Sequence, residues 1–427
     1  MKKMRRLLSI LLTLLMALSL LAGCGGEKPA EEAEKPDAPE QSEPAAESDA
    51  VKIMVFTSIS GDNAAAGAMD VAGARLAVKH INEDGGVLGG KKVELVEVDA
   101  TSDSTQAPLI LEKALASGGI SAIVGSHTSS IVLTQLPILE QYQVPCMGGP
   151  ANMTICTQGY NYFFRGGPHG EDLRDANLGM LKYLVELSGK TMEEFNVGII
   201  FENSSYGNDT AGDYGKYCEE LGFNVKVNES WAPYTLTDAS ALVTKLKQNN
   251  VDLVLSVAFP ADTKLIMNTM DTMDYNPYIV GGGAGFIWPT LYDEMGSDVN
   301  GIISAAAWNW DSTCNSEIEG WQDIVDDYEA TNGVFMAEQA GQTYSFVRVL
   351  ADAIDKAGTS DSKAVRDTLA GMTAEDSQWM KLIAPGKGGF DSTGEHDSAV
   401  GTVIQWQNDI PTTVYPLEIA ASDLLIE

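Results

Sequence analysis

From Val51 onward, short runs of apolar and often β-branched residues alternate with longer amphipathic stretches. Such runs form strands that are buried on both faces, and the amphipathic stretches form covering helices, which is the pattern of a mostly parallel α/β sheet. A second series begins at Asn196. The predicted strands are 51–57, 91–99, 120–125, 144–149, 196–202, 223–230, 251–259 and 277–282. The predicted helices are 68–84, 105–117, 130–142, 213–222 and 238–249.

The length of this alternating region predicts more than one core. Residues 51–427 exceed the roughly 250–300 residues at which a single hydrophobic core stops growing. Two series of strands within this length predict an α/β fold of two open, mostly parallel α/β sandwich lobes.

The first fifty residues indicate export. Basic residues precede an apolar run at 7–22 that ends in Leu-Ala-Gly-Cys, which is typical of a lipoprotein signal peptide over residues 1–23. A short transmembrane anchor is the alternative, but the run falls below the roughly 20 apolar residues of a spanning helix. Cys24 is expected to carry the lipid, and residues 24–50, rich in acids and proline, to form a disordered tether. We therefore predict an extracytoplasmic protein that is lipid-anchored to the cell membrane.

The net charge of −33 at pH 7 argues against nucleic acid as a partner, because the protein would repel phosphate. No second long apolar run is present in the sequence, so the chain is not predicted to be a permease itself.

Two glycine-rich segments resemble nucleotide sites only in composition. A P-loop follows a strand and opens a helix, whereas Gly85–Lys92 follows a predicted helix and precedes a strand, so its glycines are expected to end that helix and turn the chain. The segment Gly281–Gly285 follows a strand but lacks the G-x-G-x-x-G spacing. It is expected to be a plain loop or a place where the backbone approaches a ligand closely. No cofactor is predicted.

Histidines and cysteines give no indication of catalysis or metal binding. The four histidines lie in no H-E-x-x-H motif, and no G-x-S-x-G elbow occurs, so an enzyme is not predicted. The cysteines after Cys24 fit no zinc pattern. These cysteines are Cys146, Cys156, Cys218 and Cys314. The sequence allows either a disulfide between Cys146 and Cys156 or free buried thiols.

A binding site for a carboxylate is indicated at Thr128, Ser129 and Ser130. These residues lie between the end of a predicted strand and the start of a predicted helix, where free amides and hydroxyls can bind an anion. Helix capping would account for one of these hydroxyls, and the abundance of Ser and Thr in loops is the alternative explanation for the others.

Several segments, taken in order, resemble the type I periplasmic binding proteins, and most of all the leucine/isoleucine/valine-binding receptors of ABC importers. The segments are "VKIMVFTSISGD", "AIVGSHTSS", "EQYQVPCMGGPANMT", "YFFRGGP" and "FENSSYGND". The resemblance implies a three-strand hinge between the lobes, with crossings near 166–168, 301–305 and 384–389. It also implies a ligand-binding lobe 1 of residues 51–167 plus 303–385 and a lobe 2 of residues 168–302 plus 386–427.

The resemblance also assigns ligand-binding roles. Ser129 matches the residue that binds the ligand's α-carboxylate, Pro150 matches a backbone carbonyl that contacts the ligand, and Asn152 replaces a threonine. Tyr206 matches an aromatic residue that folds over the ligand. The ligand-binding residues expected on these grounds, with the apolar wall residue Phe259, are Thr128, Ser129, Pro150, Ala151, Asn152, Tyr206, Phe259 and Gly283.

Two positions depart from the family pattern. Gly283 stands near the position of a carboxylate that pairs the ligand's ammonium, and Ala66 stands where an aromatic residue is frequent. Either Glu202, Asp262 or Asp311 supplies the missing charge, or the ligand is no ordinary α-amino acid. The small residues leave room for a bulkier ligand. Aromatic residues that could wall its site are Phe259, Phe286, Trp288, Trp308 and Trp310.

The resemblance predicts a monomeric solute-binding lipoprotein that captures a small carboxylate-bearing solute, an amino acid, amide or related acid, by hinge closure. It would deliver the solute to ABC permease subunits. A sensory receptor that presents the solute to a signalling partner is the alternative, and the sequence does not separate the two.

Overall fold

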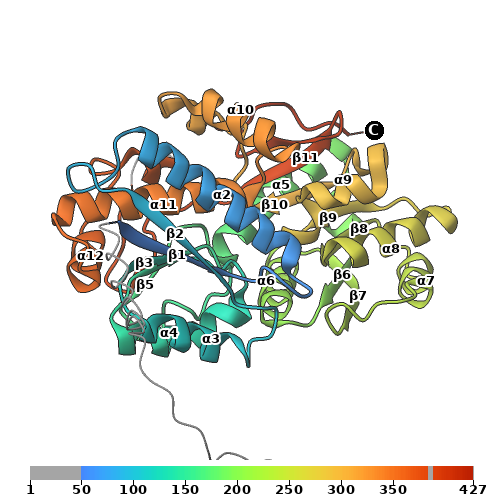
Figure 1. The fold of residues 1–427 in the computed structure, drawn as a ribbon. Coiled ribbons are helices and arrows are strands. Elements are labelled where there is room, and N and C mark those ends of the chain that lie inside the picture. Colours follow the sequence, from blue (N-terminus) through green and yellow to red (C-terminus); the bar gives the residue numbers. More distant parts are fainter. Residues whose placement is uncertain (1–49, 383–387, 427) are drawn as a thin grey trace, which may run out of the picture. The chain divides into compact units, whose positions relative to one another are not determined.

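The computed structural model describes residues 50–382 and 388–426, in which two sheets each have helices on both faces (Figure 1). The predicted α/β class with mostly parallel sheets is confirmed. The predicted signal peptide, residues 1–23, and Cys24 lie outside the described residues, as does all of the predicted tether but residue 50.

The first sheet has the strand order β2-β1-β3-β4-β5, and every pairing in it is parallel. Side chains of β1 alternate between two cores: Ile53 and Val55 pack on one face, and Met54 and Phe56 on the other. The apolar run of the sequence is therefore a strand buried on both faces. The strands are β1 (Val51–Thr57), β2 (Val93–Asp99), β3 (Ile120–Val124), β4 (Cys146–Gly148) and β5 (Phe163–Arg165).

Helices α2 and α11 cover one face of the first sheet, and α3 and α4 cover the other (Figure 1). Helix α11 is the most enclosed of these, with small and apolar residues around most of its circumference. The first sheet, these four helices and two further helices that pack in the same core, α10 and α12, are called the first lobe. Its helices are α2 (Ala64–Glu83), α3 (Ala107–Ala116), α4 (Ser129–Tyr142), α10 (Trp321–Asn332), α11 (Glu338–Ala357) and α12 (Ser362–Leu369).

The second sheet has the order β12-β11-β10-β9-β8-β6-β7 and is parallel from β10 to β7, with β11 and β12 antiparallel at one edge. Strand β8 repeats the pattern of β1, since Leu253 and Leu255 face one core and Val254 faces the other. The strands are β6 (Asn196–Glu202), β7 (Asn224–Trp231), β8 (Leu253–Val257), β9 (Tyr278–Gly281), β10 (Ile303–Ala306), β11 (Thr402–Gln407) and β12 (Ile410–Tyr415).

Five α-helices accompany the second sheet in the described residues, and together they are called the second lobe. They are α5 (Gly170–Ser188), α6 (Ser205–Leu221), α7 (Ser240–Gln248), α8 (Pro260–Thr272) and α9 (Pro289–Met295). Short 3-10 helices are η1 (Met192–Glu194), η2 (Ala284–Phe286), η3 (Gly296–Val299), η4 (Thr313–Glu317) and η5 (Gln378–Leu382). Within residues 50–382 and 388–426, no helix combines the length and the hydropathy needed to cross a bilayer.

Two of the predicted lobe boundaries need correction. Strand β10 was expected in the first lobe because the boundary was placed at residue 303, but it pairs with β9 and β11 in the second sheet. Residues 389–396 were expected in the second lobe, but Gly389 pairs with Thr373, and Glu395 forms an ion pair with Arg165 at the end of β5. At both boundaries the chain therefore crosses from one lobe to the other later in the sequence than predicted. The expected crossing at 384–389 lies largely outside the described residues.

The glycines after α2 form a turn, as predicted. A Cβ at Gly86, whose φ is +80°, would come within 2.2 Å of the Lys91 carbonyl oxygen, and a β-bridge joins Val87 to Lys91. The four cysteines after Cys24 are free thiols in this structure, and three of them are buried.

Candidate functional site

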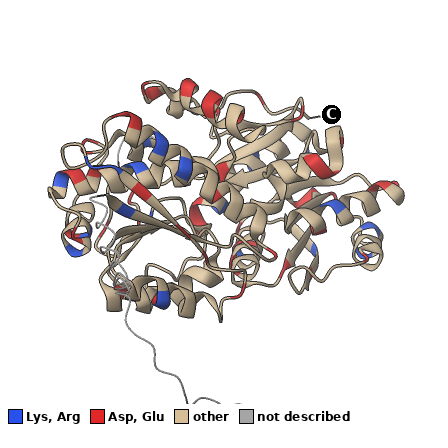
Figure 2. Cartoon of the chain, in the orientation of Figure 1, with Lys and Arg blue, Asp and Glu red and all other residues tan. Residues whose placement is uncertain are grey.

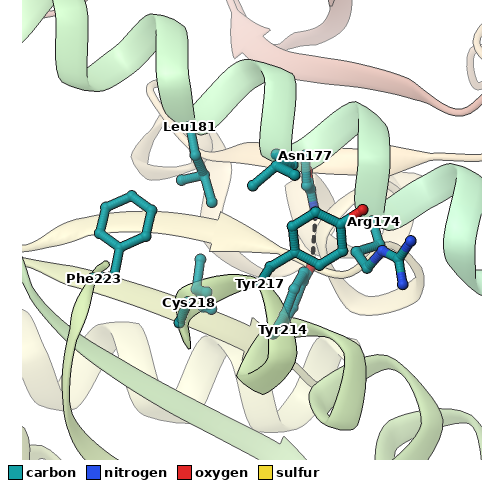
Figure 3. Close-up of a pocket in the computed structure, with 9 residues that line it drawn as sticks. Arg174, Asn177, Leu181, Tyr214, Tyr217, Cys218 and Phe223 are labelled. Atoms are coloured by element: carbon teal, nitrogen blue, oxygen red, sulfur yellow. Dashed lines mark hydrogen bonds between the residues drawn. The ribbon is translucent and has the colours of Figure 1, made fainter. Parts of the chain in front are cut away.

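A cavity of 390 Å³ lies where strands of both sheets end. Loops after β3 and β4 contribute residues 128–130, Gly149 and Ala151, and loops after β6, β8 and β9 contribute residues 204–206, Phe259 and 282–284. Ligands of open α/β sheets bind beyond the carboxyl ends of parallel strands, and the cavity occupies this position in both sheets at once. Figure 3 shows a second, much smaller cavity of 10 Å³ between α5 and α6, where Asn177 donates a hydrogen bond to the Tyr214 hydroxyl. That space is a gap in packing.

The first-lobe wall of the cavity is built around the start of α4. Thr128 is the N-cap residue, yet its hydroxyl makes no capping hydrogen bond. The amides of Ser129 and Ser130 belong to the first helical turn and have no carbonyl partner within the helix. The Ser129 hydroxyl is buried and accepts a hydrogen bond from the Asn152 amide at 3.3 Å. These groups form a neutral, donor-rich surface that suits a carboxylate.

The loop after β4 is held from behind by Arg165, which is completely buried. Its guanidinium donates to the carbonyl oxygens of Pro150 and, at 2.8 Å, Asn152, and it pairs with Glu395 at 2.7 Å. Of the three residues predicted in this loop, Ala151 lines the cavity, whereas Pro150 and Asn152 are not among its lining residues. The sequence offered no indication that a buried arginine would take these carbonyls.

The second-lobe wall includes Tyr206 and Gly283, both of which were predicted to lie there. The Tyr206 hydroxyl donates to the Gly282 carbonyl oxygen, so the ring lies across the glycine segment. Gly283 has a φ of +107°, and a Cβ there would come within 3.3 Å of the Tyr206 hydroxyl. The backbone conformation therefore favours glycine and explains why no carboxylate stands at this position.

Aromatic rings form the apolar part of the second-lobe wall. Tyr234 stacks on Phe259 with ring centroids 4.7 Å apart and an interplanar angle of 14°, and Phe259 lies 6.4 Å from Trp288. Trp288 is 5% exposed, and its indole N–H has no hydrogen-bond partner among the described residues. Of the aromatic residues proposed as walls, Phe259 and Trp288 line the cavity. The remaining three, Phe286, Trp308 and Trp310, pack in or against the hydrophobic core.

A charged group at the cavity was not predicted from sequence. Glu338, the first residue of α11, lines the cavity, and its Oε2 accepts a hydrogen bond from the Ala307 amide at 2.5 Å. Burial raises the pKa of the Glu338 carboxyl to about 7, although the Ala307 amide and the charge of His127 oppose this shift. No motif surrounds Glu338 in the sequence, so nothing in the sequence indicated that this side chain would reach the cavity.

His127 lies beside Glu338 on the same wall. Its Nδ1 is 2.7 Å from Asp70 Oδ1, and its Nε2 is 2.8 Å from Gln342 Oε1. Burial disfavours charge on this imidazole, but the Asp70 carboxylate outweighs burial and raises the pKa of His127. Both ring nitrogens are thus occupied by acceptors from helices α2 and α11.

The acidic residues that were candidates for the missing charge lie elsewhere. Glu202 is fully buried and accepts from the Ser204 amide and hydroxyl, each at 2.8 Å. Asp262 accepts from the Trp231 indole at 2.9 Å, and Asp311 accepts from Thr413. None of these three carboxylates lines the cavity.

Hydrogen bonds join the two lobes around the cavity. The Tyr234 hydroxyl donates to Asn63 Oδ1, the Met153 amide donates to Asp209 Oδ2 at 2.9 Å, and the Asn152 side-chain amide donates to the Ser205 carbonyl at 3.4 Å. The lobes are therefore in contact beside the cavity. Lysine and arginine are distributed over elements of both lobes (Figure 2). In the described part of the chain, no group of three or more His, Cys, Asp or Glu side chains is placed to hold a metal ion.

A cavity of this size between two α/β lobes, with apolar walls and a few polar groups, is the usual form of a site for a small molecule. A family model described as periplasmic binding protein matches residues 50–409, and the chain belongs to this family. A curated relative, Leu/Ile/Val-binding protein homolog 8 of Brucella abortus, is 27% identical over 380 residues, which are 88% of this chain and 92% of that protein.

Solved structures share the fold. The branched-chain amino acid transporter substrate-binding protein LivJ from Streptococcus pneumoniae, in complex with isoleucine, has a TM-score of 0.70 and 22% identity, covering 85% of this chain and 97% of that one. An ABC transporter solute-binding protein from R. palustris, in complex with benzoate, has a TM-score of 0.71 and 15% identity, covering 88% and 98%. The relatives are solute-binding proteins of ABC transporters, not enzymes, and the family implies an extracytoplasmic location.

Proposed function

We propose that this protein is an extracytoplasmic lipoprotein that captures a small carboxylate-bearing solute and delivers it to the permease of an ABC importer. The cavity of 390 Å³ carries the proposal, since it joins a donor-rich wall at residues 128–130 to an aromatic wall on the second lobe. A concave site with apolar walls and a few convergent polar groups is the usual form of a small-molecule site.

The size and lining of the cavity support a ligand with a bulky apolar or aromatic side chain. Ala66 and Gly283 leave space on two sides. Tyr234, Phe259 and Trp288 offer a flat apolar surface opposite the carboxylate-binding groups. The ligand is expected to bind the first lobe through its carboxylate and to contact these rings when the lobes close.

Hinge closure is the proposed mechanism of capture. The ligand binds the open form on the first lobe, and the second lobe adds its contacts on closing, so the ligand shifts the population toward the closed form. A ligand with micromolar affinity supplies about 8 kcal/mol in total, which exceeds the few kcal/mol that a closing equilibrium requires. The closed form is the one that a permease would recognise.

A panel of amino acids and carboxylic acids, measured by thermal shift and calorimetry, tests this proposal. A ligand should raise the melting temperature by mass action. Substitution of Ser129 by Ala should weaken its binding by about 1–3 kcal/mol, because a carboxylate loses a buried hydroxyl partner. Thr134→Val in the same helix is the control, since Thr134 bonds the Ile131 carbonyl and does not line the cavity. Indifference of the protein to the whole panel would contradict the proposal.

A further inference from the structure

One face of helix α11 lies against two segments in which the chain crosses between the lobes. The first crossing, residues 166–169, joins β5 to α5, and the second follows β10 and leads to α10. Glu338, Gln342 and Phe346 are spaced four residues apart in α11, so their side chains project from the same face of the helix. Each of these three side chains meets one or both crossings.

The second crossing is bound by its backbone. The Ala307 amide donates to Glu338 Oε2 at 2.5 Å, and the Ala307 carbonyl oxygen accepts from Gln342 Nε2 at 3.5 Å. The next residue, Trp308, rests on the same helix, since a Cβ at Gly341 would come within 2.3 Å of its ring. Glycine at this position therefore lets the crossing approach the helix closely.

The first crossing lies against the same face. A Cβ at Gly166 would come within 2.2 Å of the Phe346 ring, and a Cβ at Gly167 would come within 2.6 Å of Gln342 Nε2. Gln342 is 1% exposed and therefore contacts both crossings at once from a buried position. Its Oε1 lies 2.8 Å from His127 Nε2, which fixes the orientation of the side-chain amide.

Other contacts between the lobes lie farther from the crossings. Tyr234, which bonds Asn63, follows β7, four strand positions from β10 and thus roughly 19 Å away across the sheet. Asp209, which accepts from the Met153 amide, is on α6 after β6, three strand positions from β10. When one rigid body turns against another, groups move in proportion to their distance from the axis. These outer contacts would separate on opening, whereas contacts at the crossings would persist.

We infer that the face of α11 formed by Glu338, Gln342 and Phe346 is the pivot about which the second lobe turns, and that Gln342 couples the two crossings. The three are positioning residues, because they set the path along which the second lobe closes over the cavity. This inference rests on the proposed function, since a pivot matters only when the lobes move. It assigns the control of that movement to a first-lobe helix in addition to the crossing segments themselves.

Hydrogen exchange of the ligand-free full chain, resolved to single amides, tests the inference on wild type. The Ala307 amide donates at the pivot to Glu338, and the Met153 amide donates across the lobes to Asp209. Opening of the lobes should expose the Met153 amide and leave the Ala307 amide bonded, so Met153 should exchange faster. Equal exchange at both amides would show that the contact with α11 breaks on opening, and would overturn the inference.

Gln342→Met removes the side-chain amide and keeps most of its volume. A looser pivot adds orientations to the open form, so the Met153 amide should exchange about 2- to 10-fold faster, the ratio that one hydrogen bond's net free energy sets. Core amides of β1 should change by less. Gly167→Ala is a second variant that leaves α11 intact, because its Cβ would displace the Gln342 amide, and it should give the same result. It keeps the inference testable if Gln342→Met does not fold.

Ser345→Ala is the matched control on the same helix. The Ser345 hydroxyl donates to the Trp379 carbonyl at 2.7 Å inside the first lobe, so its loss should affect exchange at Met153 and in β1 by the same factor. A parallel change in Gln342→Met and Gly167→Ala, or no change at Met153 in either, would reduce Gln342 to a packing residue and overturn the inference. The proposed function would still stand, because the ligand panel tests it separately.

Discussion

The two walls of the cavity differ in chemistry. The first-lobe wall carries amides, hydroxyls and the Glu338 carboxylate, and it is fixed by buried polar networks around Arg165 and Asp70. The second-lobe wall presents aromatic rings and the glycines 282–283. The difference suggests a division of labour in which the first lobe selects the charged end of a ligand and the second lobe encloses its side chain.

Loss of Arg165 should damage the first-lobe wall most. Arg165→Met would leave the Glu395 carboxylate and two loop carbonyls without their buried donor, and breaking a buried ion pair by removing one partner costs about 3–5 kcal/mol. We expect this loss of stability in chemical denaturation, together with weakened ligand binding. The double variant Arg165→Met/Glu395→Gln should recover part of the stability, and full stability of the single variant would contradict the structural role of Arg165.

Titration should separate the charged wall from the apolar one. Burial raises the pKa of Glu338 from 4.5 to about 7, so between these values the folded protein holds a proton that the unfolded chain has lost. Stability of the ligand-free protein should therefore fall as pH rises from 4.5 to 7, by about 2 kcal/mol for this group. Glu202, with a similar shift, adds a parallel loss. Melting curves of wild type and Glu338→Gln measure this trend. Identical pH slopes in the two proteins would exclude Glu338 as its source.

Much of the fold could be predicted because the periodicity of a strand or a helix is visible within a short stretch of sequence. The runs around Ile53 and Leu253 became strands buried on both faces, and Thr128, Ser129, Tyr206 and Phe259 reached the cavity because residues after parallel strands meet at one edge. Strand β10 was assigned to the wrong lobe because a strand of four residues does not indicate which sheet it joins.

The rest of the site depends on contacts between distant segments. Glu338 reaches the cavity only because α11 packs beside α2, and Pro150 turns its carbonyl toward Arg165 only because that arginine is buried behind the loop. Trp308 packs edge-on against Trp321 in the core and so does not reach the cavity. Neither sequence spacing nor residue type encodes these long-range choices.

The smallest expected effect lies on the second-lobe wall, at the hydroxyl of Tyr234. This group donates across the lobes to Asn63, while its ring stacks on Phe259. Tyr234→Phe removes the interlobe bond and keeps the ring, so the closed form should lose about 0.5–1.5 kcal/mol, the net value of one hydrogen bond. Faster ligand dissociation is the expected result in stopped-flow measurements.

Tyr234→Ala is the companion variant, because it also removes the stacked ring and should weaken ligands with large side chains more than small ones. If Tyr234→Phe slowed ligand association instead of speeding dissociation, the second lobe would take part in the first recognition of the ligand. The division between a selecting wall and an enclosing wall would then be wrong. If both variants behaved like wild type, the interlobe bond and the Tyr234 ring would contribute nothing to closure, and the remaining second-lobe residues at the cavity would carry that contribution.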